Sequence, residues 1–183
     1  MKVKGTGLIT TRDFVKQNFK ERYNEWLNNL PEQTKNIYKG VIDSRGWYPL
    51  KELYLDPLDV IIQLFYKGDY KLGGDAIGAW SAQTALTGVY KVFLFVATPQ
   101  YLMSRATKIF SAFYEPCDIA VSEKEKKQVT MQITKFDEIN IALEYRIAGW
   151  CKKALELTNC NNVTYTFSKS LTKKDPYTEI IYN

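Results

Sequence analysis

The chain has 183 residues, enough for one domain with a sizeable core, and 45% of them are hydrophobic, which excludes a disordered chain. The net charge is +5, but basic and acidic residues interleave, as they do from Glu123 to Lys127, so no basic face for nucleic acid is expected. The absence of histidine excludes Ser-His-Asp and Cys-His catalysis, imidazole-ligated zinc and histidine-ligated haem.

The first part of the chain is predicted to be helical. Thr10 or Thr11 is a suitable N-cap for a helix that continues to about Asn28. A proline in the first turn favours a second, shorter helix over 31–38, which ends before a glycine. The segment 44–49 is predicted to be a turn that carries two aromatic side chains.

The middle of the chain also has helical periodicity. Asp56-Pro57 is predicted to be a cap and first-turn proline of a helix that Gly68 stops. A long helix or a helix pair is predicted from Asp75 to Val96, and Thr98-Pro99 opens another. Small residues four apart give one predicted helix a face that another element can approach closely: Gly74, Gly78 and Ala82.

The hydrophobic period changes after residue 116. Alternating residues over 117–122 and 128–136 predict a hairpin with one wet face. Asp137 is predicted to cap a last long helix, and a second hairpin follows over 163–168 and 177–182. The expected fold is therefore α+β, with a helical N-terminal two-thirds packed on a small antiparallel sheet made of two C-terminal hairpins separated by a long helix. Residues 1–183 are expected to form a single ligand-binding-like domain.

The cysteine pattern indicates a reducing, cytoplasmic setting. Cys117, Cys151 and Cys160 are odd in number, form no Cys-x-x-Cys pair and follow no signal peptide. The last two, placed on one predicted helix, are too far apart along its axis to share a metal. The longest apolar stretch, Val89 to Ala97, falls far short of the roughly 20 residues of a spanning helix, so no membrane span is expected.

The order of elements, with Lys4-Gly5, Trp47-Tyr48-Pro49 and the hairpin from Ser170 to Thr178, resembles a known superfamily. That superfamily comprises the haem-NO-binding (H-NOX) domains, the 4-vinyl-reductase-type sensors and the Golgi transport-particle subunits. The likeness spans nearly the whole chain and is greatest to a branch of uncharacterised bacterial proteins. It implies a sensory domain that binds a small molecule.

The chain departs from the family at the cofactor positions. Ser170 and Thr178 stand where vinyl-reductase-type sensors carry zinc-binding cysteines, and hydroxyls are poor zinc ligands beside thiolates. Aligning the helix after Pro99 with the haem-binding helix of H-NOX domains puts Met103 near the histidine position, with Tyr101 within one turn. The propionate-binding Tyr-x-Ser-x-Arg motif has no counterpart. No cofactor is therefore expected, neither haem nor zinc. None of the cysteines matches the acyl-bearing cysteine of the Golgi subunits.

The leading functional hypothesis is a non-catalytic sensory or regulatory domain that binds an apolar small molecule or lipid between the helices and the sheet. Apolar pockets with few polar groups are the usual form of such sites. The candidate ligand-binding residues are the aromatic side chains of the predicted helix walls and one methionine: Trp80, Tyr90, Phe93, Tyr101, Met103, Phe110, Phe113 and Trp150. The alternative is that these rings simply fill the core.

Two further hypotheses come from other classes. The small-residue face predicts a structural interaction module acting as a homodimer, although internal packing explains that face equally well. An enzyme would have to use Asp69, Asp75 or Glu144 with Tyr145, which form no recognisable constellation, so no catalytic activity is expected. Glu144 and Arg146 are interpreted as solvated helix charges.

Overall fold

A computed structural model describes residues 1–87, 99–125, 128–158 and 160–183 of the chain. Its larger sheet has four antiparallel strands in the order β4-β5-β7-β6. The strands come from two hairpins, β4 (Asp118–Glu125) with β5 (Gln128–Lys135) and β6 (Tyr165–Lys169) with β7 (Thr178–Tyr182). Residues 129–133 pair with 178–182, which joins the hairpins. This arrangement confirms the predicted α+β class.

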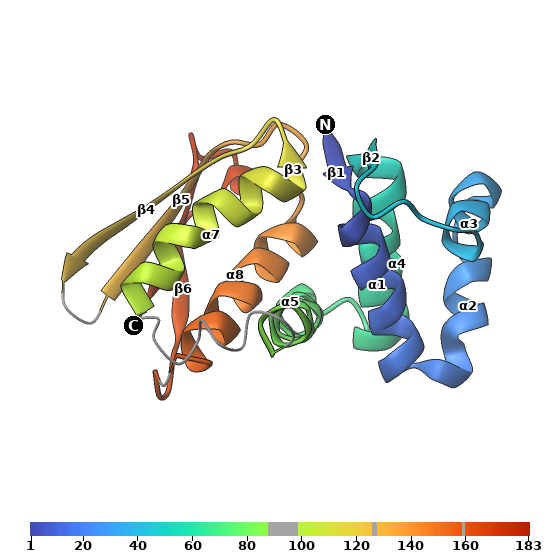
Figure 1. Cartoon of the computed structure of the whole chain (residues 1–183), viewed down its shortest axis with the longest axis horizontal. Helices are drawn as coiled ribbons and strands as arrows, with labels where there is room; N and C mark the ends of the chain where they lie inside the picture. Colours follow the sequence, from blue (N-terminus) through green and yellow to red (C-terminus); the bar gives the residue numbers. More distant parts are fainter. Residues whose placement is uncertain (88–98, 126–127, 159) are drawn as a thin grey trace.

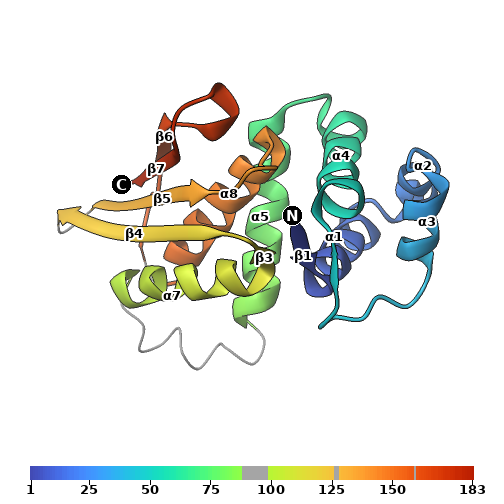
Figure 2. The ribbon, with the colours of Figure 1, turned by 90° about the horizontal axis from the view of Figure 1, so that it is seen from above.

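Helices make up most of the remaining chain. In Figures 1 and 2, α5 lies between the part of the molecule that holds the larger sheet and the part formed by the first helices of the chain. On the sheet side, α7 packs against β4 and α8 against β7. In the described ranges, the helices of four or more residues are α1 (Gly5–Asn18), α2 (Tyr23–Asn28), α3 (Glu32–Lys39), η2 (Lys51–Leu55, a π-helix), α4 (Asp56–Tyr66), α5 (Tyr70–Thr87), α7 (Pro99–Phe113) and α8 (Ile141–Glu156).

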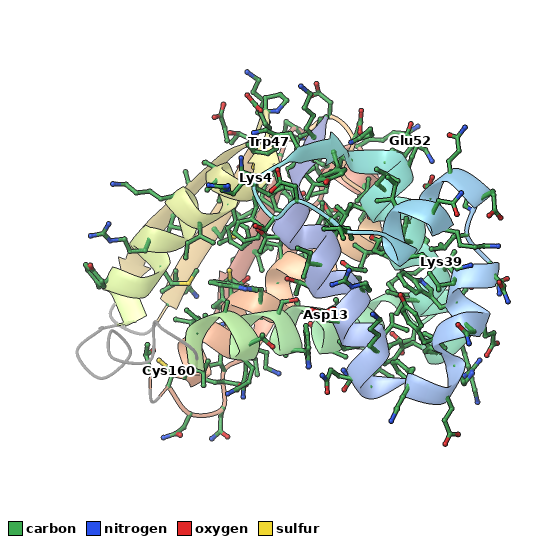
Figure 3. The ribbon with its side chains drawn as sticks, turned by 45° about the vertical axis from the view of Figure 1, so that its right-hand side comes forward. Lys4, Asp13, Lys39, Trp47, Glu52 and Cys160 are labelled. Atoms are coloured by element: carbon green, nitrogen blue, oxygen red, sulfur yellow. The ribbon has the colours of Figure 1, made fainter. Side chains whose placement is uncertain are left out.

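A second, smaller sheet was not predicted from the sequence. It has the order β2-β1-β3 and brings together three short strands, β1 (Lys2–Lys4), β2 (Trp47–Pro49) and β3 (Tyr114–Glu115). Strands of two or three residues are too short for a visible alternation. The segment predicted as an aromatic turn thus contains an edge strand, and Lys4 lies over the Trp47 ring at 3.9 Å (Figure 3).

The first helix begins and ends earlier than predicted, since the segment predicted as one helix to about Asn28 holds α1, a short 3-10 turn and α2. It starts at Gly5 rather than after Thr10 or Thr11, and no side chain caps it. Instead its first N–H groups donate to backbone carbonyls of a distant loop: Gly5 to Gly46 and Thr6 to Ser44. A Cβ at Gly5 would overlap the Asp43 carbonyl, so this approach requires glycine. A helix N-terminus that is satisfied by tertiary contacts leaves no capping signal in the sequence.

Asp56 begins α4 with Pro57 in its first turn, as predicted, but Asp56 does not cap the helix, because the π-helix η2 runs directly into α4. Proline inside a helix removes the hydrogen bond to the carbonyl four residues earlier, here that of Leu53. The hydroxyl of Tyr38 donates to this carbonyl at 2.8 Å, in a fully buried setting. A side chain from α3 therefore satisfies the acceptor that Pro57 leaves free.

The small-residue face on α5 packs against α8 of the same chain. A Cβ at Gly74 would overlap the Tyr145 side chain, and one at Gly78 would overlap the Arg146 carbonyl oxygen. On the other helix, Gly149 lies against the Asp75 backbone in the same way. The face that suggested a homodimer is thus covered internally.

Two details of the last long helix differ from the prediction. Asn140, not Asp137, caps the last long helix, with its side chain accepting from the Leu143 N–H. That helix ends at Glu156, so Cys160 lies beyond it. The apolar stretch 89–97 and the end of the predicted long helix lie outside the described residues. Within the described parts of the chain, no helix has the length and apolar character needed to cross a bilayer.

Candidate functional site

A cavity of about 210 Å³ lies between the helices α1, α5, α7 and α8. Its described walls come from α1, η2, α5, α7, α8 and the strand β3. It therefore lies between helices and the small sheet. The predicted pocket lay against the four-stranded sheet, but no described residue of that sheet lines the cavity. The lining residues are Thr6, Gly7, Thr10, Tyr54, Ser81, Thr84, Ala85, Ile109, Phe110, Phe113, Tyr114, Arg146, Ile147 and Trp150.

Arg146 of α8 is the charged residue of the described lining. It is only 5% exposed, contrary to its interpretation as a solvated charge. Its guanidinium donates to the Thr11 hydroxyl at 2.8 Å and to the Ser81 hydroxyl at 3.3 Å. It also lies 4.8 Å from the centre of the Tyr54 ring, a cation–π distance. These contacts fix the guanidinium at the wall of the cavity.

Two phenols stand beside this arginine. The hydroxyls of Tyr54 and Tyr114 are 3.0 Å apart and buried. Burial holds the pKa of Tyr114 well above its usual value, and the nearby Tyr54 adds to the increase while Arg146 opposes it. Tyr114 therefore remains a neutral phenol that can donate or accept a hydrogen bond.

The rest of the described lining includes an apolar surface. The Phe110 and Trp150 rings meet edge to face with their centres 5.5 Å apart, and Ile109, Phe113 and Ile147 complete the surface. Such T-shaped pairs are a favoured aromatic geometry. The cavity thus combines one cation and several hydroxyls with aromatic surfaces.

The predicted site residues divide into three groups. Phe110, Phe113 and Trp150 line the cavity. Three others do not appear in the described lining: Trp80, which packs on Phe14 at 5.8 Å; Tyr101, which is 47% exposed and accepts a hydrogen bond from Arg105; and the fully buried Met103. The remaining two, Tyr90 and Phe93, lie outside the described residues.

The polar residues of the cavity were missed by the sequence analysis. Arg146 and Tyr54 lie on helical segments whose periodicity indicates which face is buried but not that a charge belongs to it. A signal for Arg146 was present, because it follows the predicted core position Leu143 by three residues, a spacing that puts both on one face of a helix.

Glu144 was likewise interpreted as solvated, yet it is only 3% exposed. Its carboxylate accepts hydrogen bonds from the hydroxyls of Ser170 (2.7 Å), Thr172 (2.8 Å) and Thr178. Ser170 and Thr178, which the sequence analysis aligned with zinc-binding cysteines, therefore bind a carboxylate from α8. This cluster fastens the β6–β7 hairpin to α8. Among the described residues, no group of histidine, cysteine and acidic side chains has the arrangement of a metal site.

Comparison with known proteins identifies the fold. No protein-family model matches the sequence, and neither does any curated protein. Among solved structures, the chain is similar to the Fe(II) unliganded H-NOX protein from K. algicida (TM-score 0.70, 16% identity, covering 98% of this chain and 95% of that one). It is equally similar to an H-NOX protein from S. oneidensis in the Fe(II)NO state (0.71, 15%, 98% and 98%). The Fe(II)CO H-NOX from Shewanella woodyi also matches (0.66, 12%, 98% and 93%). The chain has the H-NOX fold, as the resemblance implied.

The prediction that no cofactor is bound is wrong for this fold. The solved structures that share it are haem-binding H-NOX proteins, so the fold points to haem as a candidate cofactor. The residues present, however, do not fit a haem. The chain has no histidine, and a cavity of about 210 Å³ is smaller than the roughly 300–1,000 Å³ of drug-sized ligand sites. The phenols that could replace an imidazole as iron ligands, Tyr54 and Tyr114, are hydrogen-bonded to each other.

Proposed function

We propose that this chain is a non-catalytic sensory or regulatory domain that binds a hydrophobic small molecule in the cavity between α1, α5, α7 and α8. The observation that carries the proposal is the cavity itself, with aromatic walls and a few polar groups. This is the usual composition of a small-molecule site. The homodimer hypothesis has no comparable support, because α8 covers the face that suggested it.

The likeness to H-NOX structures supports the proposal that this domain binds a small molecule. Those proteins were solved in unliganded, NO-bound and CO-bound Fe(II) states, so the fold is one that can hold a small ligand. Haem, the cofactor to which the fold points, is one ligand against which this cavity has to be tested.

A cavity-blocking variant tests the proposal. Ala85 lines the cavity and is exposed, so Ala85→Trp places an indole at its mouth, whereas Ala112→Trp adds the same ring at an exposed site on α7 that is not part of the described lining. The purified wild-type protein is examined by native mass spectrometry, then titrated with haemin by absorbance and with small aromatic compounds by calorimetry.

The expected result is saturable one-to-one binding of at least one compound, retained by Ala112→Trp and lost by Ala85→Trp. A one-to-one haemin complex that depends on the same cavity would also support the proposal and would identify the ligand. Equal binding by both variants, or no bound or binding compound in any titration, would contradict it.

A further inference from the structure

The charge balance around Arg146 defines the ligand more closely. Among the described residues, no carboxylate forms an ion pair with this buried guanidinium, since its described hydrogen bonds go to Thr11 and Ser81 only. Both hydroxyls already donate their protons to their own helices, to the carbonyls of Gly7 and Ile77. They are therefore held as acceptors for Arg146, and they orient it without neutralising its charge.

A buried cation without an anion is costly. Arginine remains charged inside proteins, and an ion removed from water is retained only where pairing and hydrogen bonds offset its desolvation. A guanidinium has five N–H donors in a fixed fork that matches a carboxylate. Because two described bonds leave other donors at a cavity wall, the missing anion can arrive with a ligand.

The size and walls of the cavity limit what carries that anion. An apolar cavity of roughly 150 Å³ accommodates benzene in a well-studied lysozyme variant. The present cavity of about 210 Å³ has room for one ring and a small polar substituent. Phe110 and Trp150 offer aromatic surfaces in the same cavity as the arginine, and the hydroxyl of Tyr54 or Tyr114 can donate to an acceptor beside it.

We propose that the cavity binds a single-ring aromatic carboxylate, with its carboxylate paired to Arg146 and its ring against Phe110 and Trp150. This inference rests on the proposed function and makes it specific. A neutral ring of the same size leaves the guanidinium unpaired, so the cavity discriminates by charge as well as by shape.

The test is calorimetric titration of the full chain at neutral pH with benzoate and with the isosteric neutral benzamide. Three variants are compared: Arg146→Met, which keeps length without charge; Arg146→Lys, which keeps charge without the fork; and Ala112→Trp as the surface control. Each variant is first checked for cooperative unfolding.

Benzoate is expected to bind at least roughly 30-fold more tightly than benzamide, the ratio that corresponds to losing one partner of a buried charge pair. Arg146→Met is expected to lose this preference, Arg146→Lys to keep part of it, and Ala112→Trp to keep all of it.

Equal affinity for benzoate and benzamide, or an undiminished benzoate preference in Arg146→Met, would overturn the inference while leaving a small-molecule site in place. The same holds if neither ring binds but another compound, such as haemin, occupies the cavity. Failure of the proposed function is a different result, namely no ligand of any kind that Ala85→Trp displaces.

Discussion

Glu144 and Arg146 lie two residues apart on α8, are both buried, and form no ion pair with each other. Residues at this spacing point to different sides of a helix. One charge is therefore satisfied by the hydroxyls of the β6–β7 hairpin and the other faces the cavity. The two residues should respond differently to neutralisation, one as a structural group and the other as part of a ligand site.

Glu144→Ala is expected to lower the free energy of unfolding by about 3 kcal/mol, because hydrogen bonds to a buried charge are worth about 1.5–3 kcal/mol each and three hydroxyls lose their acceptor. Urea denaturation measures the change. Glu156→Ala on the same helix is the control, since its contacts to Lys152 and Lys153 are long and partly exposed, and it should cost less than about 1 kcal/mol. Equal costs for the two variants would show that the cluster is not structural.

Arg146→Met in the ligand-free protein is expected to leave the free energy of unfolding unchanged or raise it. The substitution removes an unpaired buried charge and replaces it with an apolar side chain of similar length. Thr11 and Ser81 keep their bonds to helix carbonyls. Urea denaturation again provides the measurement, and a loss of more than about 2 kcal/mol would mean that the arginine is itself needed for the fold.

Gly78→Ala is expected to destabilise the protein by at least about 2 kcal/mol, because its Cβ would overlap the backbone of α8 and backbone cannot move aside as a side chain can. Gly40→Ala is the matched control. Its Cβ would stand 3.2 Å from the nearest atom, the Asn36 carbonyl oxygen at the end of α3, so a smaller effect is expected. Thermal unfolding of both variants measures the two losses of stability. A smaller loss in Gly78→Ala than in Gly40→Ala would contradict the close packing of α5 on α8.

Asp59 should make stability depend on pH. One of its oxygens is buried without a described hydrogen-bond partner, and burial, followed by the charge of Asp56, raises its pKa above the ordinary 3.8. The folded state then binds a proton more tightly than the unfolded state, so stability falls as pH rises from 3.8 through the folded pKa. Asp59→Asn should therefore be more stable than wild type at neutral pH, with the difference vanishing below the unfolded pKa. Thermal unfolding of both proteins over a pH series measures the difference. A lower stability of Asp59→Asn than of wild type at neutral pH would contradict the prediction.

The three cysteines should differ in reactivity. Burial is the main cause that raises the pKa of Cys117 and of Cys151 to about 12, so few thiolates form there at pH 8. Cys160 is partly exposed and lies beyond the end of α8 (Figure 3). A maleimide reagent should modify Cys160 rapidly in the native protein and all three after denaturation. Rapid native labelling of Cys151 would contradict its place in the core, and Cys160→Ser serves as the control.

Periodicity carried much of the prediction. The spacing of Leu143, Ile147, Trp150 and Ala154 predicted α8, and the alternation of Val129, Met131 and Ile133 predicted a strand with one buried face. Both signals are local, because burial along one face repeats with the period of the element itself. For the same reason the sequence did not predict β1, β2 and β3, whose pairing brings together segments far apart in the chain.

The residues that line the cavity also divide into some that the sequence predicted and others that it did not. The aromatic wall could be predicted in part, since Phe110, Phe113 and Trp150 lie on helix faces with a clear apolar period. The cationic group could not, because the burial of Arg146 depends on Thr11 and Ser81, which come from two other helices. Two hydrogen bonds also depend on distant segments. The Gly5 N–H donates to a carbonyl of a distant loop, and the Tyr38 hydroxyl donates to the Leu53 carbonyl.

The sequence by itself determined the α+β class, the last long helix, the two hairpins and the exclusion of histidine chemistry, because each follows from residue type or from a repeat within one element. Only the tertiary structure decided which polar groups are buried, where the cavity lies and what charge lines it. Those properties depend on neighbours from other elements, and the free energy of burying a polar group is set by those partners rather than by its own segment.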